Sequence, residues 1–124
     1  MSAAFTPELI KSFDETGVVE IETVSPEGTK HLMKIWLVVV NGVPYVRSVR
    51  GTKGRWYREL LARGEGAIVV RGKRTPVKAK RDSTKAAIDG TSDALRRKYK
   101  TSGASLDSML RADVLDTTVR LEPY

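Results

Sequence analysis

Alternation of apolar and polar side chains predicts six strands along this chain of 124 residues. A period of two puts successive side chains on opposite faces of a sheet, and the β-branched residues in these stretches favour that conformation. The Asn41-Gly42 pair between two of the stretches is a hairpin signal. The predicted strands cover residues 18–24, 30–40, 43–49, 67–71, 74–81 and 115–122.

Capping signals predict two helices in the first half of the chain. Thr6 can cap a helix that begins at Pro7, and this helix is expected to end near Gly17. A second helix is expected from about Arg55 to Arg63, where Gly64 ends it. Short helices that flank tightly connected strands are typical of an antiparallel barrel or sandwich with helices packed outside.

The second half of the chain predicts one interrupted helix and one short helix. Asp82 or Ser83 is expected to cap a helix that extends toward Tyr99. The weak helix formers Gly90-Thr91-Ser92 in its middle are expected to break or kink it. Residues 105–111 are expected to form one or two further helical turns.

Two of the predicted strands carry unusual positions. Pro76 cannot donate a backbone hydrogen bond, so strand 74–81 is expected at a sheet edge or with a bulge. Strand 30–40 is apolar on both faces, with Ile35 and Trp36 on opposite sides, and therefore needs cover on both. Either a packed helix or a second copy of the chain, as in a homodimer, would supply the second cover.

A glycine-rich break with four cations follows the predicted strand 43–49. A bend that enters a helix exposes backbone N–H groups that bind anions, and arginine adds a planar fork that matches phosphate. We call residues 47–56 the basic corner and interpret it as a phosphate cradle; the alternative is a solvated basic turn. Its candidate ligand-binding residues are Arg47, Ser48, Arg50, Gly51, Lys53, Gly54, Arg55 and Trp56.

The composition limits the chemistry that the chain can perform. It has no cysteine and a single histidine, His31, which excludes thiolate catalysis, disulfides and a multi-histidine metal site. His31 is expected at the surface, and Glu20 and Glu22 are expected to face solvent rather than to act as an acid–base pair. The longest apolar run, residues 35–40, is too short to cross a bilayer, and the N-terminal residues do not resemble a signal peptide. We therefore expect a cytoplasmic protein without a membrane segment.

The net charge of +7 suits nucleic acid, an anionic membrane surface or an anionic small ligand. The cations gather between Arg47 and Arg81, but no recognised nucleic-acid motif accompanies them, so nucleic acid is the less favoured partner. The shortage of acid–base side chains favours a redox cofactor, because a flavin supplies its own hydride chemistry.

These segments resemble the flavin-binding split β-barrel superfamily, which includes pyridoxamine phosphate oxidase and the deazaflavin-dependent nitroreductases, and within it a small uncharacterised bacterial family. The resemblance in strand order covers nearly the whole chain, and the residue-level match covers about residues 34–72. It implies an α+β, mainly β fold: a six-stranded antiparallel split β-barrel with short flanking helices, as a single domain over residues 1–124. The matching segments are Lys34–Val40, Asn41-Gly42, Tyr45–Ser48 and Gly51 through Gly54–Arg58.

In that superfamily the cofactor lies in a groove between two subunits, and its phosphate is held at the end of the third strand and the start of the next helix. The resemblance implies FMN, or alternatively the deazaflavin coenzyme F-420, in a homodimeric oxidoreductase that acts on an unknown small-molecule substrate. It implies that Lys34, Ile35 and Trp36 run beside the ring system, and that the basic corner holds the phosphate. No catalytic side chain and no metal ligand are assigned.

Two other functions stay open at this point. A basic nucleic-acid-binding module would use the cations of residues 47–58 and 73–81, and its binding would weaken steeply with salt. A split barrel without a cofactor would serve as a binding protein, because a fold does not fix a function.

Overall fold

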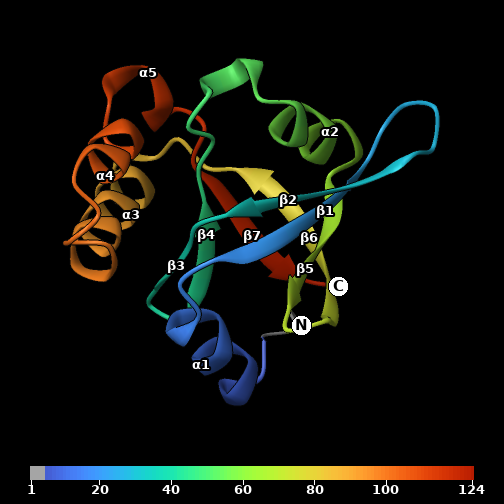
Figure 1. Ribbon diagram of the computed structural model, residues 1–124, viewed down its shortest axis with the longest axis horizontal. Helices are drawn as coiled ribbons and strands as arrows, with labels where there is room; N and C mark the ends of the chain where they lie inside the picture. Colours follow the sequence, from blue (N-terminus) through green and yellow to red (C-terminus); the bar gives the residue numbers. More distant parts are fainter. Residues whose placement is uncertain (1–4) are drawn as a thin grey trace.

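The computed structural model describes residues 5–124, which form a curled antiparallel sheet with helices around it (Figure 1). The fold is α+β and mainly β, as predicted, but the described residues contain seven strands rather than six. The strand order in the sheet is β2-β1-β5-β6-β7-β4-β3. The strands are β1 (Val19–Val24), β2 (Lys30–Ile35), β3 (Leu37–Val40), β4 (Val43–Val46), β5 (Glu65–Val70), β6 (Lys73–Arg81) and β7 (Val119–Pro123).

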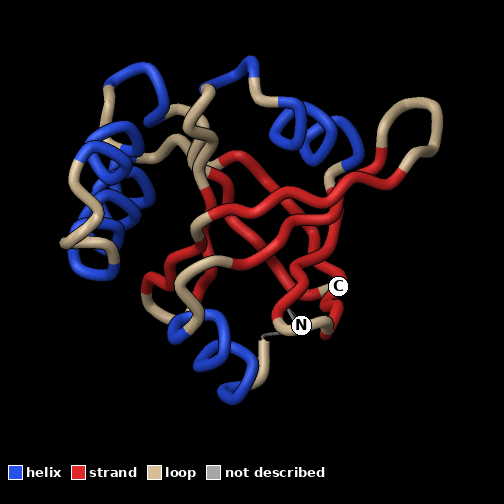
Figure 2. The backbone as a smooth tube through the Cα atoms, viewed as in Figure 1, coloured by secondary structure: helices blue, strands red, loops and turns tan. Residues whose placement is uncertain are grey.

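The seventh strand arises because the predicted strand 30–40 is interrupted at Trp36. Its first half, β2, pairs with β1, and its second half, β3, pairs with β4. These two consecutive strands therefore lie at opposite ends of the strand order, and the sheet must curl to bring its ends together. Figure 2 shows the strands as a curled central unit with the helices outside it. The arrangement is a half-barrel whose open seam is crossed by the chain at Trp36.

Helix positions in the first half of the chain follow the sequence signals. Thr6 caps the first helix by accepting a hydrogen bond from the Leu9 amide at 3.2 Å, as expected. The second helix has the predicted bounds and ends at Gly64, whose φ of 69° lies in the left-handed region. The helices are α1 (Pro7–Glu15), the 3₁₀ turn η1 (Gly51–Lys53), α2 (Arg55–Arg63), α3 (Lys85–Lys98), α4 (Ala104–Met109) and α5 (Ala112–Leu115).

The expectation of a break in the third helix is wrong, because α3 runs without interruption through Gly90-Thr91-Ser92. Tertiary contacts outweigh the low helix propensity of these residues. A methyl group at Gly90 would lie 3.0 Å from a methyl carbon of Val40, so glycine allows close packing of the helix on β3. The helix is capped by Thr84 rather than by Asp82 or Ser83.

Strand limits differ from the prediction where side chains compete for backbone groups. Strand β7 begins at Val119 rather than at residue 115, since the hydroxyls of Thr117 and Thr118 bond to the Val114 and Leu115 carbonyls and stabilise the turn after α5.

Strand β6 lies inside the sheet between β5 and β7, which contradicts the expectation of an edge strand. Pairing with β7 begins only at Val77, so Pro76, which has no N–H, faces an unpaired side of the strand.

Two hydrophobic clusters hold the fold together. The first joins the strands to α1 and α2 through side chains such as Phe13, Ile21 and Leu60, each 0 % exposed. The second joins β3 and β4 to α3 and α4. Helix packing therefore covers the apolar faces of β3, whereas Leu32 and Met33 on β2 stay 54 % and 43 % exposed.

Candidate functional site

A groove of about 630 Å³ lies between β2, the basic corner, the start of α2 and α4. We call it the main groove. Most residues predicted from the sequence line it: Lys34, Ile35, Trp36, Arg47, Arg50, Gly54, Arg55 and Trp56. Ser48 and Gly51 are buried and Lys53 is exposed, and none of these three is among the lining residues.

Five lining residues were not predicted. Met33 and Val49 adjoin predicted positions and are both 43 % exposed, so they form an open apolar rim. Ser105, Ser108 and Met109 come from α4. Their spacing puts them on one helical face, and this spacing is the sequence signal that could have identified them. Nothing local in the sequence links that face to the basic corner, which lies far away along the chain.

Arg47 differs from the other cations of the corner because its side chain is only 2 % exposed. Its Nε donates to the Thr118 hydroxyl at 3.0 Å, and its Nη1 donates to the Ser92 hydroxyl and the Met109 carbonyl, both at 3.0 Å. Its Nη2 donates to the Ile88 carbonyl at 3.1 Å. Burial, and secondarily the charge of Arg96, lowers the pKa of Arg47 to about 10, so the guanidinium stays charged at neutral pH.

Two glycines shape the basic corner. Gly51 has a φ of 65°, which favours glycine, and its amide bonds to the Ser48 carbonyl at 3.0 Å. Gly54 is the N-cap of α2, so no side chain caps the first amides of that helix. Ser48 Oγ lies beneath Gly54, buried and without a hydrogen-bond partner. The first backbone donors of α2 therefore have no side-chain partner, and the positive end of the helix dipole favours an anion there.

The cations of the main groove form no salt bridge within the described residues. Among the described residues, Lys34, Arg50 and Arg55 take part in no salt bridge, and no aspartate or glutamate lines the groove. Some exposed cations elsewhere do have partners, as in the Arg74–Glu22 pair at 2.7 Å, whereas others, such as Lys73 and Lys80, form no salt bridge. Clustered cations without carboxylates repel one another, so an anion that enters the groove is attracted by all of them.

Two of the residues that line the main groove, Trp36 and Trp56, pack against other aromatic side chains. Trp36 stacks on Tyr99 with ring centroids 3.9 Å apart and planes 4° from parallel. The Tyr99 hydroxyl is anchored in turn on the Gly17 carbonyl at 2.7 Å. Trp56 is 8 % exposed and packs edge-to-face on Tyr57 with centroids 6.3 Å apart. Trp56 is thus a core side chain and Trp36 is half-buried against the second hydrophobic cluster, and both line the groove.

A buried carboxylate lies one turn after the start of α2. Glu59 is 9 % exposed and accepts hydrogen bonds from the Thr23 hydroxyl at 2.8 Å and from His31 Nδ1 at 3.1 Å. Burial by itself would raise the pKa of Glu59, but the bonds from Thr23 and His31 outweigh it and hold the pKa below its ordinary value. His31 is therefore half-buried and packed against α2, not a free surface residue as expected. This cluster ties α2 to β1 and β2.

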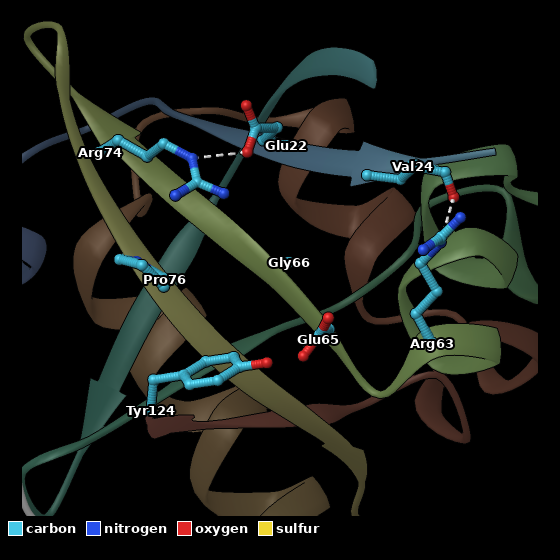
Figure 3. A pocket seen from close by; sticks show the side chains of 8 residues that line it. All are labelled: Glu22, Val24, Arg63, Glu65, Gly66, Arg74, Pro76 and Tyr124. Carbon is cyan, nitrogen blue, oxygen red and sulfur yellow. Dashed lines mark hydrogen bonds and ion pairs between the residues drawn. The ribbon is translucent and has the colours of Figure 1, made fainter. Parts of the chain in front are cut away.

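A second cleft of about 360 Å³ lies over β1, β5 and β6 (Figure 3). Glu22 and Glu65 line it together with Arg63 and Arg74, so its charges balance. Arg74 is bonded to Glu22, and Arg63 donates to the Val24 carbonyl at 3.3 Å, as the dashed lines show. Most of its polar groups already have partners, so the cationic main groove is the better candidate for a ligand site.

Two kinds of feature are absent from residues 5–124. No group of three or more histidine, aspartate or glutamate side chains there is arranged to hold a metal ion. None of the helices over that range is long and apolar enough to span a membrane.

Solved structures with similar folds share little sequence with this chain. The haem storage protein HutZ of Vibrio cholerae is 14 % identical, with a TM-score of 0.66 over 98 % of this chain and 92 % of HutZ. A protein of Listeria innocua proposed to be a pyridoxamine 5′-phosphate oxidase is 7 % identical, with a TM-score of 0.65 over 93 % of this chain and 89 % of its own. A structure described as a domain-swapped dimer is 15 % identical, with a TM-score of 0.63 over 88 % and 81 %. At these identities the likeness shows the fold, which is split-barrel-like.

Sequence comparison gives the family. A search of curated proteins finds no match to the chain. A family model described as "Uncharacterized protein conserved in bacteria (DUF2255)" matches residues 9–121, nearly the full length. The chain belongs to this family.

Proposed function

We propose that this chain binds a flavin-type cofactor in the main groove and acts as an oxidoreductase on a small-molecule substrate. FMN is the first candidate, and the deazaflavin coenzyme F-420 is the alternative. The observation that carries the proposal is the set of unpaired cations around the uncapped start of α2, next to an aromatic wall. Such a surface suits a flat ring system that bears a phosphate.

The lining residues fit the two ends of this cofactor. Arg50 and Arg55 are exposed and would neutralise the phosphate, while the amides after Gly54 would donate to its oxygens. Trp36 and Met33 would contact the ring, with the Lys34 ammonium near one of its edges. Arg47 is left out of the direct contacts because four of its five N–H groups are bonded inside the protein.

A bound flavin or deazaflavin supplies hydride transfer, so the protein need not supply an acid–base pair. The lining residues include no histidine, aspartate or glutamate, which agrees with that division of labour. The chain's own contribution is then to hold the phosphate, orient the ring against Trp36 and exclude water from one of its faces.

We further propose that the functional unit is a homodimer in which a second copy covers the open side of the groove. Leu32 and Met33 are consecutive on the edge strand β2 and are both exposed, although they lie on opposite faces. Such an edge needs cover in a soluble protein. Sedimentation analysis should find a dimer, and Met33→Glu, on the groove side of β2, should shift the chain toward the monomer.

The test of the cofactor site compares FMN with riboflavin, which lacks the phosphate. The wild type should bind FMN more tightly, as followed by quenching of flavin fluorescence. The double substitution Arg50→Gln and Arg55→Gln should remove this preference, since each charge-assisted hydrogen bond is worth about 1.5–3 kcal/mol. A matched control replaces Lys73 and Lys80 on β6 by glutamine, which makes the same charge change away from the groove.

Three outcomes would contradict parts of the proposal. If the wild type binds neither FMN nor F-420, the cofactor reading fails. If the control pair on β6 lowers FMN affinity as much as the corner pair, the corner is not the phosphate site. If FMN and riboflavin bind equally well, the phosphate contributes nothing to the binding free energy.

The nucleic-acid alternative loses support from the pairing of β6. Lys78 lies between Glu65 on β5 and Glu122 on β7 in the sheet register, and Arg74 is paired with Glu22. Carboxylates thus interrupt the basic stripe that nucleic acid would need. A gel-shift titration at low salt should show no retardation.

Haem is a second candidate ligand, because the Vibrio cholerae neighbour is described as a haem storage protein. Cations of the groove suit carboxylate groups, and Met33 and Met109 place thioether side chains in its lining. The chain's one histidine does not line the groove and is bonded to Glu59. A haem titration followed in the visible spectrum should therefore give weaker binding than FMN; tighter binding would favour haem.

A further inference from the structure

Arg47 is the largest fully buried side chain in the described part of the molecule. Its four hydrogen bonds reach three separate segments: α3 at Ile88 and Ser92, the end of α4 at Met109, and Thr118 just before β7. All of these segments come from the second half of the chain, whereas Arg47 directly follows β4. One side chain therefore connects the barrel to the helices that lie on one side of it in Figure 1.

The partners of Arg47 are all neutral. Among residues 5–124 it forms no salt bridge, although a buried arginine normally has a carboxylate partner. Hydroxyl and carbonyl oxygens offset the cost of burying the charge only if each keeps its geometry. Movement of α3 or α4 away from Arg47 would leave a buried cation without partners, so these elements are strongly held in place.

This constraint bears on the main groove through α4. The helix has only six residues, too few to be stable alone, and Arg47 bonds to the carbonyl of its last residue, Met109. The same helix supplies Ser105, Ser108 and Met109 to the groove. The position of that wall therefore depends on a side chain that lies beneath it.

We propose that Arg47 is a positioning residue of the groove, which fixes the α4 wall through Met109 and the adjoining α3 through Ser92, and leaves the anion to Arg50 and Arg55. The choice of a flavin as the ligand rests on the proposed function, but the positioning of α4 by Arg47 does not. This role replaces the role of a direct phosphate ligand that the sequence favours. Loss of Arg47 should then weaken binding by changing the shape of the groove. A ligand with a phosphate and a ligand without one should be affected alike.

The experiment uses Arg47→Lys, which keeps the charge but loses the fork, and Ser92→Ala, which removes one acceptor and is the milder change. Dissociation constants for FMN and riboflavin are measured for each folded variant. Hydrogen exchange is followed over residues 104–109, with α1 (Pro7–Glu15) as the reference helix. We expect Arg47→Lys to weaken both flavins by a similar factor of about ten. Exchange over 104–109 should rise while exchange in α1 stays unchanged.

Other results would overturn the inference. A loss confined to FMN would make Arg47 a direct anion ligand, and unchanged affinity for both flavins would remove it from the site. A rise in exchange that is equal in α1 and α4 would show general destabilisation instead of local positioning. If the wild type binds no flavin, the proposed function fails and the exchange comparison alone decides the role of Arg47. If Arg47→Lys does not fold, Ser92→Ala gives the same comparison.

Discussion

The contact between Gly54 and Ser48 allows a direct test of how the basic corner is packed. A methyl group at Gly54 would lie 2.5 Å from Ser48 Oγ, about 1 Å inside ordinary contact distance. The backbone at Gly54 has φ of −61° and ψ of 130°, which alanine adopts without strain. Backbone strain therefore adds nothing, and the cost of Gly54→Ala combines the poorer N-cap with crowding, which in a packed site is about 1–3 kcal/mol.

Removing the hydroxyl should relieve this crowding. Ser48 Oγ has no hydrogen-bond partner, so Ser48→Ala alone is expected to be neutral or slightly stabilising. The Ser48 Cβ lies 3.7 Å from the new methyl, an ordinary contact. In the Ser48→Ala background, Gly54→Ala should be close to neutral, because the gain of about 0.4–1 kcal/mol from restricting the unfolded chain is opposed by the poorer N-cap.

Urea denaturation of the wild type, both single variants and the double variant measures the coupling free energy. We expect about 1–3 kcal/mol, the crowding cost that Ser48→Ala relieves. The slopes of the four transitions should agree, so that the midpoints report stability. An equal cost of Gly54→Ala in both backgrounds would refute the reasoning, because the crowding would then not involve Ser48.

Three further predictions concern buried polar and close-packed positions. Glu59→Gln should destabilise the fold by about 1–3 kcal/mol at neutral pH. Folding lowers the pKa of Glu59 from 4.5, so the stability difference between wild type and variant should be constant above pH 4.5 and shrink below it. Urea denaturation at several pH values measures this difference, and a difference that does not change with pH would contradict the prediction. Gly90→Ala should gain the full helix propensity of about 1 kcal/mol only when Val40 is also alanine, as thermal unfolding of the two pairs would show. Tyr99→Phe should cost about 1 kcal/mol and remove a tyrosine that ionises only near pH 12 in an ultraviolet titration, because burial raises the pKa of Tyr99 to about 12.

Local signals in the sequence were sufficient where the structure depends on local geometry. The bounds of α2 follow from the glycines on each side of it, and Thr6 caps α1 as its side chain predicts. The break at Trp36 carried no such signal, because apolar residues continue through it. Closure of the sheet requires the break, and closure is a property of all seven strands.

The candidate site was predictable only on the side that is continuous in sequence. The basic corner and β2 are near one another along the chain, and their residues do share the main groove. The α4 wall comes from residues 104–109, whose sequence is unremarkable beyond its helical spacing. Its role depends on its position after α3 in the fold, and neither composition nor periodicity predicts that position.

The four cations of the corner look equivalent in the sequence, but the structure divides them by the face on which they lie. In β4, Val46 belongs to the first hydrophobic cluster and Tyr45 to the second, so successive side chains point to opposite faces. The next residue, Arg47, continues this alternation on the Tyr45 side, where α3 and α4 cover it. Beyond Ser48 the strand pattern has ended, and Arg50 and Arg55 turn to solvent. One corner thus contains two kinds of cation: one whose charge is already surrounded by protein oxygens, and others whose charge an incoming anion would have to neutralise.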